Sequence, residues 1–165
     1  MQEVRIMTLM TTSEAGLNII KKYEGLRLKA YKCPAGVWTI GYGHTKGVTS
    51  SMVINEATAN AYLREDVRSA EVVLNKLGIN FRQGQFDALV SWLFNLGAGS
   101  FASSTLRKKI VANAKDEEIT DQIIKWVNAG GKPLLGLKKR RVEEANLFLG
   151  KTRYAIDKSE KIVKV

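Results

Sequence analysis

Apolar side chains recur every three or four positions through most of the chain, a spacing typical of one face of an α-helix. The longest such run starts after Asn55, a residue that caps helices well, and ends before Gly78, a residue that stops them. Its apolar stripe consists of Ala59, Leu63, Val67, Ala70, Leu74 and Leu77. At about 1.5 Å per residue, a helix of roughly 22 residues spans about 33 Å, which is long enough to join two lobes.

The same periodicity predicts further helices on both sides of this run. The first follows Ser13 and ends at Gly25, and the stretch Thr11-Thr12-Ser13-Glu14 fits a capping box. Downstream, the pattern indicates helices over residues 81–96, 104–112, 116–128 and 134–149. The tail after residue 150 has little pattern, and we expect it to fray.

Strand character is confined to residues 28–32 and 37–42, with the turn Cys33-Pro34-Ala35-Gly36 between them, which predicts a β-hairpin. We therefore expect an α+β protein with a single domain over residues 1–165. Its expected parts are a small N-terminal lobe (about 13–54), a connecting helix (about 55–77), a helical C-terminal lobe (about 78–150) and a tail (151–165). A cleft is expected between the two lobes.

The chain is strongly basic, with 26 Lys and Arg against 16 Asp and Glu and a formal net charge of +10. Residues 132–165 hold 10 of the basic and 4 of the acidic residues, a net +6. Such a field favours a polyanionic partner, namely nucleic acid, anionic lipid or an acidic cell-wall polymer, although charge can also serve solubility alone.

Composition excludes several classes of protein. No stretch approaches the roughly 20 apolar residues of a membrane span. The N-terminal segment lacks the apolar run and cleavage site of a secretory signal, so we expect any work outside the cytoplasm to depend on another route of release. A single cysteine cannot form an internal disulfide, and one cysteine with one histidine cannot fill a Cys/His zinc site. We expect no metal and no cofactor.

The segment from Tyr23 to Thr45 concentrates the reactive side chains, because it holds the only histidine and the only cysteine. Glu24 falls at the C-terminal end of the first predicted helix, where the negative end of the helix dipole favours a protonated carboxyl group. A neutral carboxylic acid can protonate the leaving oxygen in glycoside hydrolysis. From helix position alone, a carboxylate that solvates the helix end is the better explanation, and a lone cysteine is more often a small buried apolar residue.

The order of motifs changes that interpretation. Glu24, Cys33 and Thr39 are separated by eight and five residues, and four segments occur in the order EGLRLKAYKC, WTIGYGHT, WLFNLGAGSFASSTL and KWVNAGGKPLLGLKKRR. Over roughly residues 13–150, this arrangement resembles the phage-type lysozymes and endolysins of glycoside hydrolase family 24. The resemblance implies a lysozyme-like fold and a muramidase that cleaves the β-1,4 bond between N-acetylmuramic acid and N-acetylglucosamine in bacterial peptidoglycan.

By this resemblance, Glu24 is the general acid and Thr39 holds the attacking water. Cys33 stands at a position that many members fill with aspartate and some with cysteine. We expect Lys29 or Lys32 to lower the pKa of its thiol. Whether Cys33 acts as a base, a nucleophile or a neutral positioning group stays open, and so does the inverting or retaining outcome.

The resemblance also implies residues around this centre. His44 would pair with Asp66 on the long helix and support the loop, with no role as a base. Thr45, Phe94 and Thr105 are candidate substrate contacts, although Phe94 also fits the apolar stripe of its helix.

Two further groups of residues have alternative roles. One residue of the basic run is expected to pair with Glu24 or to hold the lobes together, while most of the run would be solvated; the run consists of Lys138, Lys139, Arg140 and Arg141. Core packing is favoured over sugar stacking for the three tryptophans, Trp38, Trp92 and Trp126.

An endolysin of this kind would be a monomer that stays in the host bacterial cytoplasm until its release to the periplasm or cell wall, and a partnership with a holin would fit. Its charge would favour contact with anionic cell-wall or outer-membrane polymers in addition to peptidoglycan. Nucleic acid is not an expected partner, because no recognised motif accompanies the charge. The alternative is a cationic membrane-active antibacterial protein whose basic C-terminal helix, residues 134–149, disrupts bilayers.

Overall fold

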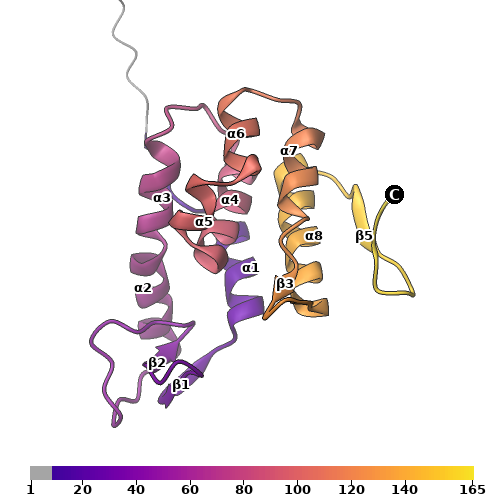
Figure 1. Ribbon diagram of the computed structural model, residues 1–165. Helices are drawn as coiled ribbons and strands as arrows, with labels where there is room; N and C mark the ends of the chain where they lie inside the picture. Colours follow the sequence, from indigo (N-terminus) through magenta and orange to yellow (C-terminus); the bar gives the residue numbers. More distant parts are fainter. Residues whose placement is uncertain (1–8) are drawn as a thin grey trace, which may run out of the picture.

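The computed structural model describes residues 9–165 (Figure 1). The start of the chain, where we expected no secretory signal, lies partly outside the described residues. The elements are α1 (Glu14–Glu24), β1 (Arg27–Lys32), β2 (Trp38–Gly41), α2 (Glu56–Asp66), α3 (Arg68–Asn75), α4 (Gln83–Leu96), α5 (Ala98–Ala102), α6 (Thr105–Val111), α7 (Asp116–Ile123), β3 (Asn128–Ala129), β4 (Lys132–Pro133), α8 (Leu135–Leu149), β5 (Tyr154–Ile156) and β6 (Ile162–Lys164). The strands form three two-stranded antiparallel sheets, so the predicted α+β class is confirmed. None of the described helices has both the length and the apolar character that a bilayer crossing requires.

Helix α4 forms the centre of the molecule. Every residue from Gln85 to Leu93 is buried, as expected for a helix surrounded by others. It packs against α1, α3 and α8, and Figure 1 shows α1 and α4 between the α2–α3 pair and the α7–α8 pair.

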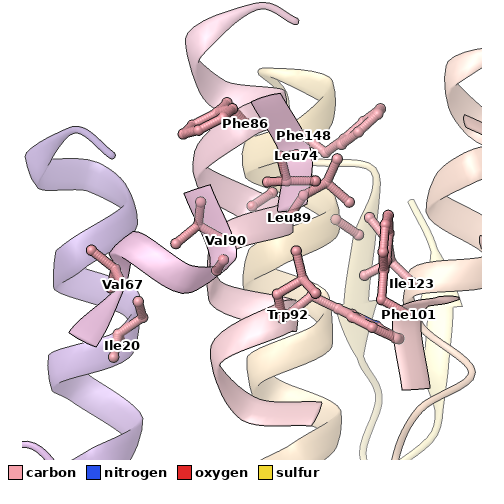
Figure 2. Close-up of a cluster of buried hydrophobic side chains, with 14 of the residues drawn as sticks. Ile20, Val67, Leu74, Phe86, Leu89, Val90, Trp92, Phe101, Ile123 and Phe148 are labelled. Atoms are coloured by element: carbon pink, nitrogen blue, oxygen red, sulfur yellow. The ribbon is translucent and has the colours of Figure 1, made fainter. Parts of the chain in front are cut away.

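The apolar core joins side chains from widely separated parts of the chain (Figure 2). Trp92 of α4 is fully buried and meets the rings of Phe101 and Trp126 edge to face, at centroid distances of 6.0 and 5.1 Å. Full burial of a large apolar side chain stabilises a fold by about 1.5–3 kcal/mol, so this cluster contributes strongly. The core role predicted for Trp92 is confirmed, and Trp126 is half-buried but packs against the core. Trp38 is half-buried at the start of β2.

The stripe expected to form one connecting helix forms two helices that meet at Val67. This residue keeps helical angles (φ −74°, ψ −12°), and its N–H still donates to the Leu63 carbonyl at 3.0 Å. The Asn55 side chain caps α2 as predicted, since it accepts a hydrogen bond from the Thr58 N–H at 2.8 Å. The interruption is therefore one residue wide, and the predicted apolar face is retained.

The predicted capping box at the start of α1 is wrong. Ser13 is the N-cap residue, but its side chain makes no capping bond and its hydroxyl pairs with Asp87 of α4. The N–H of Thr12 donates to Glu71 of α3 at 2.6 Å. Carboxylates from two distant helices thus accept the hydrogen bonds at the start of α1, whereas Glu14 of the predicted capping box is exposed.

The expectation that the tail frays is also wrong. Residues after 150 form the β5–β6 hairpin, with Tyr154 paired to Lys164. The Tyr154 side chain is 1% exposed, and its hydroxyl lies 2.7 Å from the Thr120 hydroxyl of α7. Partners on α7 and the Asn146 side chain of α8, which no local pattern in the tail reveals, order this segment.

Candidate active site

The β1–β2 hairpin carries two of the three candidate catalytic residues. Tyr31 pairs with Thr39, and the turn closes with the Cys33 N–H donating to the Val37 carbonyl at 3.0 Å. Gly36 adopts φ +79° in this turn, a conformation that favours glycine. The turn places Cys33 at the end of β1, close to Thr39 on β2.

The outer edge of β1 is covered by the segment that precedes α2. The Ala30 N–H donates to the Met52 carbonyl at 3.0 Å, and the Ile54 N–H donates to the Leu28 carbonyl at 2.9 Å. These bonds fix the hairpin to the start of α2, and they give the short sheet a rigid support.

Hydrogen bonds from the Val37 and Ala35 backbone lower the pKa of the half-buried Cys33 thiol, and partial burial opposes them. Thr39 adds a smaller effect in the same direction. The expectation that Lys29 or Lys32 would cause this shift is wrong, because backbone groups of the turn cause it and the Lys32 ammonium lies 5.4 Å from the Trp38 ring. A lowered thiol pKa increases the thiolate fraction near neutral pH.

The Thr39 hydroxyl is buried and donates to the Val37 carbonyl at 3.0 Å. A hydroxyl has one proton, so this group can donate either to that carbonyl or to the sulfur of Cys33, but not to both. Its lone pairs stay free to accept a hydrogen bond from water.

Glu24 is the last residue of α1, and Gly25 follows it at φ +73° as the predicted helix stop. Its side chain is 25% exposed, and Oε2 lies 3.3 Å from Arg140 Nη1 of α8. Its Oε1 faces Gly43, where a Cβ atom would lie 3.8 Å away. The carboxylate therefore lies between the loop that leaves β2 and helix α8.

Arg140 is the member of the basic run that pairs with Glu24. Lys138 instead donates to the Glu160 carbonyl at 2.6 Å, Lys139 is exposed, and Arg141 pairs with Glu144. Sequence reasoning missed Glu144 entirely. The signal that could have found it is its spacing from the two arginines. Glu144 follows Arg140 by four residues and Arg141 by three, which places its side chain next to both on the helix surface.

The predicted contact between His44 and Asp66 is present. His44 Nδ1 lies 2.8 Å from Asp66 Oδ2, and the ring stacks on Tyr62 at a centroid distance of 4.0 Å. The His44 backbone exchanges two 2.9 Å hydrogen bonds with Ile40. These contacts hold the loop after β2 against α2.

The candidate substrate contacts are spread over three elements. Thr45 is exposed after the His44 loop, Phe94 is half-buried in the last turn of α4, and Thr105 is the exposed first residue of α6. Among the described residues, no hydrogen bond joins any of the three to Glu24.

A cavity of about 490 Å³ lies elsewhere, between α6, α7 and β6. Its lining includes Lys109, Asp121 and Ile162 and none of the candidate catalytic residues. In the part of the chain that the structure describes, no cluster of three or more His, Cys, Asp or Glu side chains could hold a metal ion.

Residues 21–144 match the family model described as Phage lysozyme, which is most of the chain. The chain belongs to the phage lysozyme family. It is 46% identical over 145 residues to an endolysin of Acyrthosiphon pisum secondary endosymbiont phage 1, which covers 84% of this chain and 98% of that one. It spans about half the length (54%) of the Bacillus phage B103 endolysin, to which it is 43% identical over 144 residues, 85% of this chain.

Solved structures agree with this family. A mutant of P22 lysozyme superposes with a TM-score of 0.77 at 35% identity, covering 85% of this chain and 99% of that one. The muramidase domain of SpmX from Asticaccaulis excentricus gives 0.78 at 35% identity, covering 84% and 97%. The chain is thus a phage lysozyme of the endolysin kind, a glycoside hydrolase. The family match contains every candidate site residue and ends before the β5–β6 hairpin.

Proposed function

We propose that this lysozyme cleaves the β-1,4 bond between N-acetylmuramic acid and N-acetylglucosamine in bacterial peptidoglycan, with Glu24 as general acid. The observation that carries the proposal is the position of Glu24 between Arg140 and Gly43, beside the hairpin that bears Cys33 and Thr39. A carboxyl group at this junction can reach a sugar bound between the two lobes, while Arg140 fixes its orientation.

In the proposed reaction, the Glu24 carboxyl proton moves to the glycosidic oxygen as the bond from this oxygen to the anomeric carbon breaks. A water molecule attacks that carbon from the opposite face and gives its proton to the Cys33 thiolate, and the Thr39 oxygen accepts a hydrogen bond from the same water. The lowered thiol pKa supports Cys33 as this base. Attack by water itself gives an inverting outcome.

Other residues would hold the site and the sugar chain. His44 and Asp66 would support the loop that contains Gly43, because their contact attaches it to α2. Thr45, Phe94 and Thr105 would contact the substrate. The relatives named endolysin support release to the cell wall. We further propose that the protein acts as a monomer, is held in the host bacterial cytoplasm until its release and works with a holin.

Contact with anionic cell-wall or outer-membrane polymers is part of the same proposal. Arg27, Lys29, Lys32 and Lys46 are all exposed on the N-terminal lobe. Residues 25–55 contain no Asp or Glu, so this surface keeps its positive charge.

The bilayer-disrupting alternative is not favoured, since α8 is an internal helix. Its Arg140, Arg141 and Phe148 side chains are buried. A helix whose cationic and apolar side chains are already packed cannot present them to a membrane without unfolding.

Loss of turbidity of purified peptidoglycan tests the enzymatic proposal. Glu24→Gln should abolish hydrolysis because an amide N–H is far too weak an acid to protonate the leaving oxygen. Glu14→Gln is the matched control, since it makes the same change at an exposed position of the same helix and should keep full activity. A Glu24→Gln protein that clears peptidoglycan at the normal rate would contradict the proposal.

A further inference from the structure

A buried group of charges lies behind Glu24, where α8 packs against α4. Arg140, Arg141 and Glu144 are 2%, 0% and 0% exposed, and Glu24 completes the group, which we call the buried charge cluster. Water cannot screen the charges of Arg140, Arg141 and Glu144, so each of these three requires a partner of opposite sign inside the protein.

Glu144 contacts both guanidinium groups of the cluster. Its Oε1 lies 2.8 Å from Arg141 Nε, and its Oε2 lies 3.3 Å from Arg140 Nε. The Ser91 hydroxyl of α4 donates to the same Oε2 at 2.5 Å. Arg140 extends its Nη1 to Glu24, so one guanidinium group is shared between two carboxylates.

Few other groups face the cluster. On α4, the Asn95 side chain accepts from Arg141 at 2.8 Å, and the Ser91 carbonyl accepts from Arg140 at 3.1 Å. On α1, the Tyr23 ring lies 6.0 Å from the Arg140 guanidinium carbon. Burial and a hydrogen bond to Glu143 raise the Tyr23 pKa, so this phenol stays neutral. Glu143, the next acid on α8, pairs with Lys22 at 3.0 Å.

The net charge of the buried charge cluster depends on whether Glu24 is protonated. Burial raises the pKa of Glu144, while both guanidinium groups oppose that effect. The two guanidinium contacts and the Ser91 hydroxyl favour the carboxylate form of Glu144. The cluster then has one excess positive charge when Glu24 is protonated and none when Glu24 is ionised.

We propose that Glu144 is a positioning residue of the reaction, which holds Arg140 and balances its charge so that Glu24 retains its proton until the glycosidic oxygen takes it. This inference rests on the proposed role of Glu24 as general acid. Without Glu144, a protonated Glu24 would leave two uncompensated cations, and their charge favours loss of the proton. With Glu144, the single excess charge is neutralised when the proton leaves, which favours the transfer.

The pH dependence of peptidoglycan hydrolysis tests this role. Activity should fall on the alkaline side as Glu24 loses its proton. In Glu144→Gln, which removes a negative charge, the alkaline fall in activity should shift to lower pH by about one unit. At pH values above the midpoint of the fall, this shift corresponds to about tenfold lower activity. Arg141→Gln removes a positive charge and should shift the fall to higher pH. Glu144→Asp keeps the charge and should leave it in place.

Glu71→Gln is the matched control, because Glu71 is a buried carboxylate of α3 that accepts a hydrogen bond from Thr12. It should lower the melting temperature without moving the alkaline fall. The same result in Glu144→Gln would show a merely structural role and would overturn the inference. If Glu144→Gln does not fold by circular dichroism, Arg141→Gln is the deciding variant. The inference is overturned if Arg141→Gln loses activity on the alkaline side at the same pH as the natural protein or at a lower pH.

Glu24→Gln separates this inference from the proposed function. An active Glu24→Gln protein would contradict the role of Glu24 and the inference together. An inactive Glu24→Gln protein, combined with an unmoved alkaline fall in Glu144→Gln, would contradict the inference alone.

Discussion

The β1–β2 and β5–β6 hairpins are both short, antiparallel and rich in basic residues, yet their cations are used differently. On the first hairpin and the loop after it, Arg27, Lys29, Lys32 and Lys46 are exposed, and residues 25–55 contain no Asp or Glu. On the second, Arg153 lies 3.0 Å from Glu117, and Lys164 lies 3.0 Å from both Glu117 and Asp121.

This difference shows that the net charge of a sequence segment does not reveal where positive electrostatic potential is concentrated on the protein surface. The C-terminal residues 132–165 have the larger excess of positive charge, yet Arg140 and Arg141 in that segment are also buried in ion pairs. We infer that the first hairpin serves catalysis and anionic partners, and that the second stabilises the helical lobe. Each prediction below tests this division.

The largest expected effect is on catalysis by the first hairpin. Cys33→Ser should lower peptidoglycan hydrolysis by about 10²-fold or more, because a serine hydroxyl is far too weak an acid to supply a general base at neutral pH. Cys33→Asp should keep or raise activity, since a carboxylate can take the proton of the water. Turbidity assays at matched protein concentration provide the measurement, and equal rates in all three proteins would make the thiol a bystander.

The second hairpin should affect stability instead. Tyr154→Ala should lower the free energy of unfolding by about 3 kcal/mol, because it removes a fully buried ring. Tyr154→Phe is the control that keeps the ring, and loss of its hydroxyl partners should cost only about 1 kcal/mol. Urea denaturation measures both changes. A stable Tyr154→Ala protein with reduced activity would contradict the division.

Weakening the contact that supports the loop after β2 is expected to have an intermediate effect. Asp66→Asn should lower the free energy of unfolding by about 1–3 kcal/mol, since it weakens the bond to the buried His44 ring. Activity per folded molecule should change only a few-fold. Thermal denaturation and initial rates at low temperature separate the two effects, and a large loss of rate in a fully folded protein would point to a catalytic role.

A smaller effect is expected when the exposed lysines of the first hairpin are replaced. Lys29→Gln combined with Lys32→Gln should lower the salt concentration needed to elute the protein from an immobilised anionic polysaccharide. Arg153→Gln combined with Lys164→Gln removes the same formal charge from paired positions and should lower that concentration less. Equal shifts in the two double variants would break the comparison between the hairpins.

The smallest effect concerns pH. Hydrogen bonds from Lys164 and Arg153 lower the pKa of Glu117 below its ordinary value of 4.5. The resulting stabilisation is present above that value and is lost as the pH falls through the lowered pKa. The melting temperature of the natural protein should therefore exceed that of Glu117→Gln at pH 7, and the two should converge in stronger acid. A constant difference would show that the pairs do not act through charge.

Local patterns predicted much of this fold, because many helix ends and turns depend on neighbouring residues only. Asn55 and Gly25 mark their helix ends as expected, and the first hairpin lies where its turn residues place it. The helical stripe that ends in Gly97 was likewise correct, since α4 stops there.

The errors arise where a distant partner decides the local structure. The start of α1 is bonded to Asp87 and Glu71 in place of its own Glu14, and the tail is ordered by α7. In the site, the resemblance to phage lysozymes led to Glu24, Cys33 and Thr39 and to the His44–Asp66 contact. It could not distinguish Arg140 from its basic neighbours or find Glu144, because burial of charge depends on how helices pack.

The bonds that join Ala30 and Leu28 to Met52 and Ile54 also affect how the protein behaves in a crowded cell. A two-stranded sheet with a bare outer strand offers unpaired amides and carbonyls to another chain, which invites intermolecular strand pairing. Here the Ala30 N–H and the Leu28 carbonyl on that side of β1 are already paired within the same molecule. High local concentrations should therefore not lead to aggregation through this edge.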